Sequence, residues 1–144
     1  LLETCAWSGL IVACLAPERV PVCFEESRQG WVDICYPDYS NEYDKVWHNK
    51  LAFYEVGNGD YYGIELEKEN YGKIVYLSHD GGDGGDAHGH YIADNFKDLL
   101  NNWSKVGCVG GEDWQWEPFY TEGKGIDFEC ENAKEWREYI FSKI

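Results

Sequence analysis

The sequence predicts an α+β fold in which helices pack on one face of a central antiparallel sheet, a meander. Two observations predict this class. Apolar, strand-like runs joined by short turns dominate the chain up to residue 77, and apolar residues recur every three to four positions after residue 91. Strands that come first and helices that follow favour such a layered arrangement. The 144 residues are the usual size of one domain, and no repeat or linker divides them, so we expect a single domain over residues 1–144.

Three strands are predicted in the middle of the chain, at Leu51–Val56, Tyr61–Glu67 and Lys73–Leu77. The first two are separated by Gly57-Asn58-Gly59-Asp60, and Asn-Gly between apolar runs is a strong hairpin signal. The second and third are separated by a turn at Asn70-Tyr71-Gly72. Short turns join only antiparallel neighbours, so the three strands form the meander.

Two more strands are expected upstream. Leu10–Leu15 is continuously apolar, and Gly30–Tyr36 alternates between apolar and polar residues. In the second strand of the meander, Glu65 and Glu67 are two positions apart and are expected to share its solvated face.

Two amphipathic helices are predicted in the second half. The first is expected to be capped by Asn95 and to end before Gly107, and the second is expected to be capped by Asn132 with Glu135. Their apolar stripes contain Ile92, Phe96, Leu99, Leu100 and Trp103 in the first helix and Ala133, Trp136, Tyr139 and Ile140 in the second.

The chain is strongly acidic, with 27 acidic and 12 basic residues and a net charge of −15. Nucleic acid and anionic lipid are poor partners for it, because phosphate binding requires Lys and Arg. No apolar run approaches the roughly 20 residues of a membrane span. A basic protein is the natural partner of such a surface; the alternative is that the acidity only keeps the domain soluble.

The six cysteines are expected to be reduced, as in a cytoplasmic protein. A domain of this size can build a core without disulfides, no basic signal segment opens the sequence, and no Cys-x-x-Cys pair suggests zinc. They are Cys5, Cys14, Cys23, Cys35, Cys108 and Cys130.

The Gly-rich loop between His79 and His90 contains three aspartates, Asp80, Asp83 and Asp86. With the nearby histidines they could gather around calcium or zinc. The calcium-loop pattern of alternating ligands and a final Glu is absent, however. We therefore expect no metal and no cofactor here, and we interpret the aspartates as charges that steer a basic partner.

The other candidate contact segment is Glu112-Asp113-Trp114-Gln115-Trp116. If it is extended, Trp114 and Trp116 share one side and form an aromatic patch ringed by acid, which is typical of protein contact surfaces. The alternative is that they cap the core between the two helices. Catalysis is not expected, because no nucleophile, carboxylate-pair or phosphate-loop signature is present.

Three segments resemble the SUKH superfamily, which includes yeast cell-wall regulators of the Smi/Knr type and many bacterial immunity proteins. They are Asn58–Leu66, Lys73–Asp80 and Ile92–Leu100, and the resemblance runs from Leu51 to Trp103. The family's opening helices are not found before Trp47, which fits a divergent chain or one that lacks them.

The resemblance implies an α+β fold without catalysis and transfers no catalytic residue. It further implies an immunity protein that neutralises a cognate toxin, often a nuclease, by direct binding. The alternative is a regulatory interaction domain without a toxin. The residues expected to contact the partner are Asp80, Asp83, Asp86, Glu112, Asp113, Trp114 and Trp116.

Overall fold

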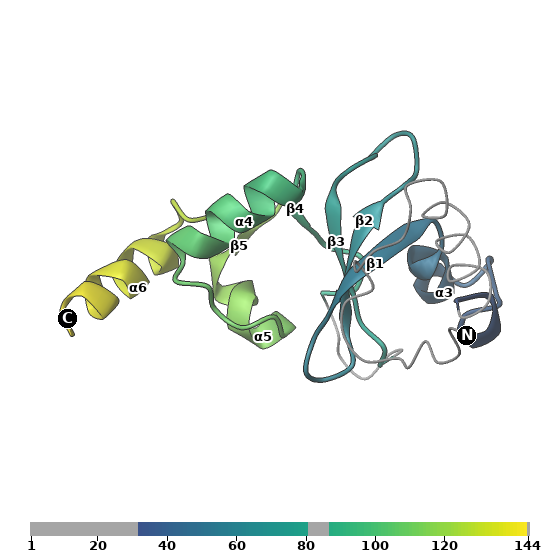
Figure 1. Cartoon of the computed structure of the whole chain (residues 1–144), viewed down its shortest axis with the longest axis horizontal. Coiled ribbons are helices and arrows are strands. Elements are labelled where there is room, and N and C mark those ends of the chain that lie inside the picture. The colour runs from purple at the N-terminus through teal and green to yellow at the C-terminus, as the bar shows by residue number, and fades with distance from the viewer. Residues whose placement is uncertain (1–31, 81–86, 144) are drawn as a thin grey trace, which may run out of the picture.

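The computed structural model describes residues 32–80 and 87–143. The predicted strand at Leu10–Leu15 lies outside these residues. The elements, in chain order, are α2 (Asp33–Cys35), α3 (Glu42–Trp47), β1 (Lys50–Glu55), β2 (Tyr61–Glu65), β3 (Ile74–Leu77), β4 (Tyr91–Ala93), α4 (Phe96–Lys105), α5 (Asp113–Trp116), the 3₁₀-helix η2 (Glu117–Phe119), β5 (Tyr120–Thr121), β6 (Gly125–Ile126) and α6 (Glu131–Phe141). Figure 1 shows the sheet between two groups of helices.

The sheet is antiparallel, with strand order β1-β2-β3-β4. The predicted meander is confirmed, and the turn residues Gly59 and Gly72 have positive φ angles of 99° and 90°, which glycine adopts at little steric cost. The fourth strand was not predicted: Ile92 belongs to β4 and not to the following helix. A strand of three residues is too short to show a period.

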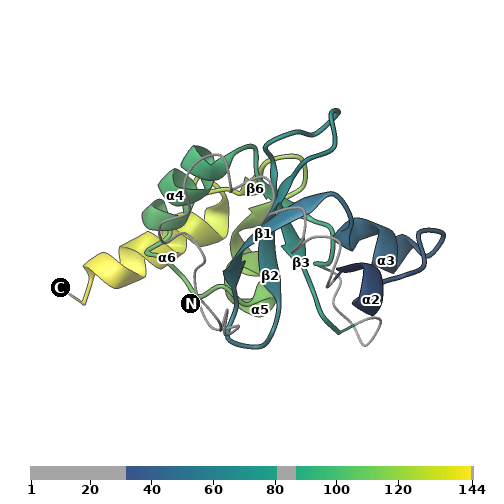
Figure 2. The same ribbon diagram turned by 45° about the vertical axis from the view of Figure 1, so that its right-hand side comes forward.

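One face of the sheet carries α4 and α6, as predicted, together with the short helix α5, which was not predicted. Leu99, Trp116 and Ala133 of these helices belong to the same buried cluster as Tyr62 and Tyr76 of the sheet. In Figures 1 and 2, α4 and α6 lie side by side beyond the strands.

The helix ends were predicted with mixed success. The side chain of Asn95 caps α4 by accepting a hydrogen bond from the backbone N–H of Asp98 (2.9 Å). Asn132, by contrast, does not cap α6. Cys130 occupies the N-cap position, and the Asn132 amide donates to the carbonyl of Pro118 (2.7 Å).

The opposite face of the sheet is covered as well, which the sequence did not predict. Trp47 of α3 packs with Val32 against Val75 and Leu77 of β3. The six-residue helix α3 is capped by Asn41, whose side chain accepts from the N–H of Tyr43 (3.0 Å). With only six residues and an acidic first turn, α3 is too short to show the apolar period of a helix.

The described part of the predicted strand at Gly30–Tyr36 is helical. The N–H of Tyr36 donates to the carbonyl of Val32 (2.7 Å), and the Tyr36 ring stacks on Trp47 at 4.4 Å. Val32 and Tyr36 are four residues apart, so one helical face holds both, whereas Ile34 is 77% exposed. Apolar residues two apart indicate a strand and apolar residues four apart fit a helix, but Val32, Ile34 and Tyr36 satisfy both patterns in so short a segment.

Glu65 is buried, contrary to the expectation of a solvated strand face, whereas Glu67 is exposed. The carboxylate of Glu65 pairs with the ammonium of Lys50 (2.9 Å) and accepts from the hydroxyl of Tyr91 (2.9 Å). Burial, together with this hydrogen bond, raises the pKa of Tyr91 to about 12. β2 ends at Glu65, so the two-residue alternation does not extend to Glu67.

Cys35, Cys108 and Cys130 are free thiols, and the other three cysteines lie outside the described residues. In the part of the chain that is described, no helix has the length and apolar character needed to cross a bilayer.

Candidate functional site

The helix α5 places the two tryptophans of the candidate contact segment on different sides. Its first turn is fixed by the N–H of Glu112, which donates to the side-chain carbonyl of Gln115 (3.0 Å). Residues two apart on a helix are separated by about 200° around its axis. Trp114 is therefore 64% exposed, whereas Trp116 is 0% exposed and packs against Tyr76.

Trp116 is thus a core residue and offers no surface to a partner, so its assignment as a contact residue is corrected here. The extended conformation that would have put both rings on one side does not form. The interpretation of Trp116 as a cap on the core agrees with the structure.

Trp114 is exposed but held in place. Its indole N–H donates to the carboxylate of Glu112 (2.6 Å), and its backbone N–H donates to the carboxylate of Asp113 (2.8 Å). The N–H edge of the ring is therefore occupied, while the ring itself remains open to solvent. An ordered, exposed indole between two carboxylates can stack on an apolar or cationic side chain.

A buried carboxylate, Asp60, lies behind this segment. One of its oxygens accepts from the backbone N–H (2.9 Å) and the ring Nδ1 (2.7 Å) of His79. The other accepts from the amide of Asn58 (2.6 Å) and from the hydroxyl of Tyr76. Burial alone raises the pKa of Asp60, but the hydrogen bonds from Tyr76, His79 and Asn58 outweigh it and leave the pKa below its usual value. Asp60 therefore stays ionised at neutral pH.

Asp60 connects the two segments that the sequence singled out. On one side, Nε2 of His79 lies 3.0 Å from the carboxylate of Asp80. On the other, the hydroxyl of Tyr76 accepts from the backbone N–H of Asp113 (3.3 Å). Both segments are thus tied to one buried charge, near the β1–β2 turn that lies beside α5 in both views (Figures 1 and 2). We call this region the acidic edge; it consists of Asp80, Glu112, Asp113 and Trp114 at the surface and of the buried Asp60 that joins them.

Sequence reasoning missed the residues that connect the edge, namely Asp60, Tyr76 and His79. Asp60 follows an Asn-Gly pair, a pattern that predicts an exposed turn residue. It is nevertheless only 3% exposed, because Tyr76 and His79, which are distant in sequence, contact its carboxylate. An acidic residue at the start of a strand that otherwise faces the core is the one signal that could have pointed to it.

Asp83 and Asp86 lie outside the described residues. Among residues 32–80 and 87–143, no group of three or more His, Cys, Asp or Glu side chains could hold a metal ion.

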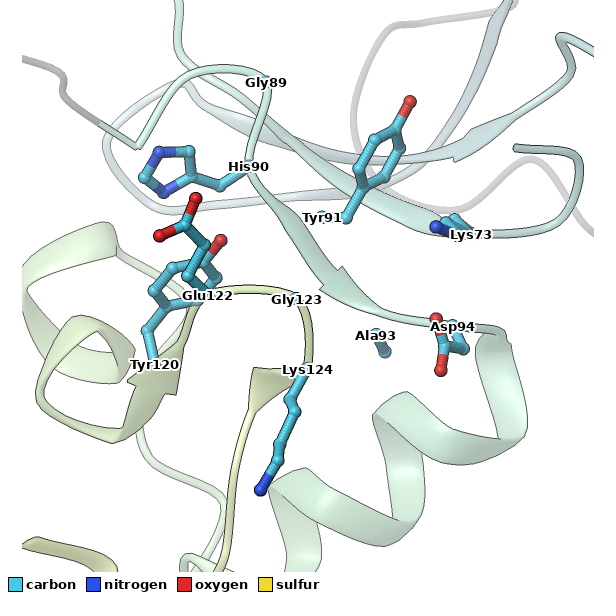
Figure 3. A pocket seen from close by; sticks show the side chains of 10 residues that line it. All are labelled: Lys73, Gly89, His90, Tyr91, Ala93, Asp94, Tyr120, Glu122, Gly123 and Lys124. Carbon is cyan, nitrogen blue, oxygen red and sulfur yellow. The ribbon is translucent and has the colours of Figure 1, made fainter. Parts of the chain in front are cut away.

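A separate cavity of about 300 Å³ lies between β4 and the β5–β6 hairpin (Figure 3). His90 stacks on Tyr120 in its wall at 4.9 Å, and Lys124 pairs with Asp127 at 3.0 Å. Its lining mixes two amines with two carboxylates, so the charges give it no preference for anions or cations. The ionisable and aromatic residues that line it are Lys73, His90, Tyr91, Asp94, Tyr120, Glu122 and Lys124.

Comparison with known proteins supports the resemblance found in the sequence and extends it toward the N-terminus. Residues 15–102 match the SMI1/KNR4 family (SUKH-1), a range that exceeds half of the chain and includes α2, α3, all four strands of the larger sheet and most of α4. α5 and α6 follow the matched range. No curated protein and no solved structure matches the chain. With its four-stranded antiparallel sheet and its match over these residues, the chain belongs to the SMI1/KNR4 family (SUKH-1).

Proposed function

We propose that this chain is a non-catalytic protein-binding domain that neutralises a cognate toxin by direct contact, using the acidic edge. The observation that carries the proposal is Trp114, an exposed indole whose orientation is fixed by Glu112. Binding hot spots are enriched in Trp, and a side chain that is already ordered loses little further conformational entropy on binding.

The charge of the domain supports a basic partner. Glu112 and Asp113 place carboxylates beside the anchor, Asp80 belongs to the same network through His79, and the whole chain has a net charge of −15. Opposite charges steer encounter over a Debye length of about 8 Å at physiological ionic strength. Charge therefore supplies the association rate, and Trp114 supplies the desolvated contact that slows dissociation.

The buried carboxylate of the edge favours a role in binding over one in catalysis. Asp60 already accepts four hydrogen bonds, two on each oxygen. A general base or nucleophile needs a free lone pair that faces substrate. Asp60 instead fixes the two segments that present the contact residues.

Family membership favours two functions. The resemblance includes toxin-neutralising bacterial proteins, and a nuclease toxin would match an acidic inhibitor because nucleases bind a polyanion. The matched family is named after the cell-wall regulators SMI1 and KNR4. A regulatory interaction domain without a toxin partner is therefore the second candidate function. We infer a cytoplasmic location for either role, where the thiols would stay reduced.

Protection from toxicity tests the proposal. The gene next to the source gene would be expressed in a host with and without this chain. We expect the neighbouring product to be toxic alone and harmless with the chain. A toxic product against which the chain gives no protection and forms no complex would refute the immunity role.

A further inference from the structure

His88 joins the end of β3 to α3. Its Nδ1 lies 2.9 Å from the backbone nitrogen of Ser78, and its Nε2 lies 3.1 Å from the carbonyl oxygen of Tyr43. The imidazole also stacks on the Tyr43 ring at 4.3 Å and lies 6.0 Å from the ring of Trp47. His88 therefore links the helix that covers the second face of the sheet to the residue after β3, beside a direct hydrogen bond from the Tyr43 hydroxyl to the carbonyl of Ser78.

These two partners determine where the ring proton is. The backbone N–H of Ser78 can only donate, so Nδ1 must accept with its lone pair. The carbonyl of Tyr43 can only accept, so Nε2 must have the hydrogen. Only the neutral Nε2–H tautomer of His88 satisfies both bonds. A second proton, on Nδ1, would point at the N–H of Ser78 and remove that bond.

The other histidines with partners at both nitrogens differ in this respect. In His79 both nitrogens face carboxylates, those of Asp60 and Asp80. In His48, Nε2 lies 2.7 Å from the carbonyl of Tyr36, and Nδ1 lies 3.6 Å from a carboxylate oxygen of Asp33. A proton added to either of these rings meets an acceptor. Among the described residues, His88 alone has a hydrogen-bond donor facing one of its nitrogens.

The surroundings of His88 agree with a neutral ring. Burial lowers its pKa, the Tyr43 carbonyl and the charge of Asp60 act to raise it, and the charge of Lys50 lowers it again. The net direction is downward. A folded-state pKa below the unfolded value means that the unfolded chain takes up the proton first, so stability is complete above about pH 6.5 and falls as the pH drops below it.

We propose that His88 is a pH-sensitive link whose protonation weakens the attachment of α3 to the end of β3, which then depends on the Tyr43–Ser78 hydrogen bond and on the packing of Trp47. Ser78 is followed by His79 and Asp80, so opening at Ser78 leaves this segment of the acidic edge held by the hydrogen bonds of His79 to Asp60 and no longer by His88. Any loss of partner affinity at low pH rests on the proposed function, whereas the opening itself is a property of the isolated chain.

The tautomer is tested by long-range ¹H–¹⁵N NMR of the imidazoles of the isolated chain at pH 7.5. We expect the Nε2–H form for His88, with an unprotonated Nδ1. An Nδ1–H form or a doubly protonated ring at this pH would overturn the proposal.

The switch is tested by urea unfolding of three proteins between pH 7.5 and pH 5.5, where ordinary carboxylates hardly titrate. His88→Asn keeps an acceptor near the Nδ1 position and cannot titrate. His90→Gln removes a neighbouring histidine that stacks on Tyr120 and serves as the control. On acidification below about pH 6.5, we expect the unfolding equilibrium constant to rise more steeply in the wild type and in His90→Gln than in His88→Asn. The difference between these slopes should reach at most about tenfold per pH unit, the effect of one proton.

The protection factors of the α3 amides, which correct for the slower intrinsic exchange at lower pH, should fall over the same pH range in the wild type and in His90→Gln but not in His88→Asn. Equal pH slopes in the wild type and in His88→Asn, or α3 protection factors in the wild type that do not fall with pH, would overturn the proposal. Both readouts use the isolated chain, so they can fail while the binding function stands.

Discussion

Replacing Asp60 by Asn should loosen the acidic edge while changing the side chain by a single group. Asn keeps one acceptor oxygen but puts an NH₂ donor where the second oxygen accepted two hydrogen bonds. One pair of donors, either the two N–H groups of His79 or those of Asn58 and Tyr76, then loses its acceptor oxygen. A hydrogen bond to a charged group contributes about 1.5–3 kcal/mol, so the loss of two gives a cost of roughly 3–6 kcal/mol at pH 7.

The pH dependence of this cost separates it from a general packing defect. The pKa of Asp60 is depressed in the folded state, so its contribution is present above the unfolded value near 4 and is lost as the pH falls below it. The gap in stability between the wild type and Asp60→Asn should therefore be largest at pH 7 and should shrink toward pH 3.

Urea unfolding followed by far-UV circular dichroism measures the gap, and Asp94→Asn, a change of an exposed carboxylate, is the control. A cost below about 0.5 kcal/mol at pH 7, or a gap that does not change with pH, would refute the role assigned to Asp60.

Two further predictions concern the candidate contact residues. Trp116→Ala should cost roughly 3–5 kcal/mol in thermal or urea unfolding because it empties a fully buried site, whereas Trp114→Ala should stay within about 0.5 kcal/mol of the wild type; equal losses would contradict the placement of these two rings. Changing Asp80, Asp83 and Asp86 together to Asn should slow association with a basic partner several-fold at low salt and leave the dissociation rate nearly unchanged, as measured by surface plasmon resonance; an effect on dissociation alone would refute the steering role.

The meander was predictable because its signals are local. The Asn58-Gly59 turn defines one hairpin, and Asn95 identifies the start of α4 by its own side chain. The strand β4 and the helix α3 were missed because each is only a few residues long and depends on contacts far along the chain. Trp47, for example, is buried by Val75 and Leu77, which no periodicity near residue 47 reveals.

The candidate site was predictable in its exposed parts and not in its buried ones. Asp80 and the segment from Glu112 to Trp114 stood out by composition. The separation of Trp114 from Trp116 depends on a helical turn that Glu112 and Gln115 stabilise, so the capping residues were the signal for it. The joining of the two segments through Asp60 and Tyr76 is a tertiary arrangement that sequence alone cannot supply.

The central claim is that the acidic edge binds a basic partner with Trp114 as its anchor. The most direct test measures the kinetics of binding to the neighbouring gene's product for the wild type, Trp114→Ala and Tyr71→Ala. Tyr71 is a matched control, since it is 72% exposed and lies in the β2–β3 turn at the other end of the strands.

We predict that Trp114→Ala dissociates at least tenfold faster, because truncating a hot-spot residue costs more than about 1 kcal/mol, whereas Tyr71→Ala binds like the wild type. Dissociation of Trp114→Ala at the wild-type rate from a complex that otherwise forms would contradict the assignment of the acidic edge as the binding surface.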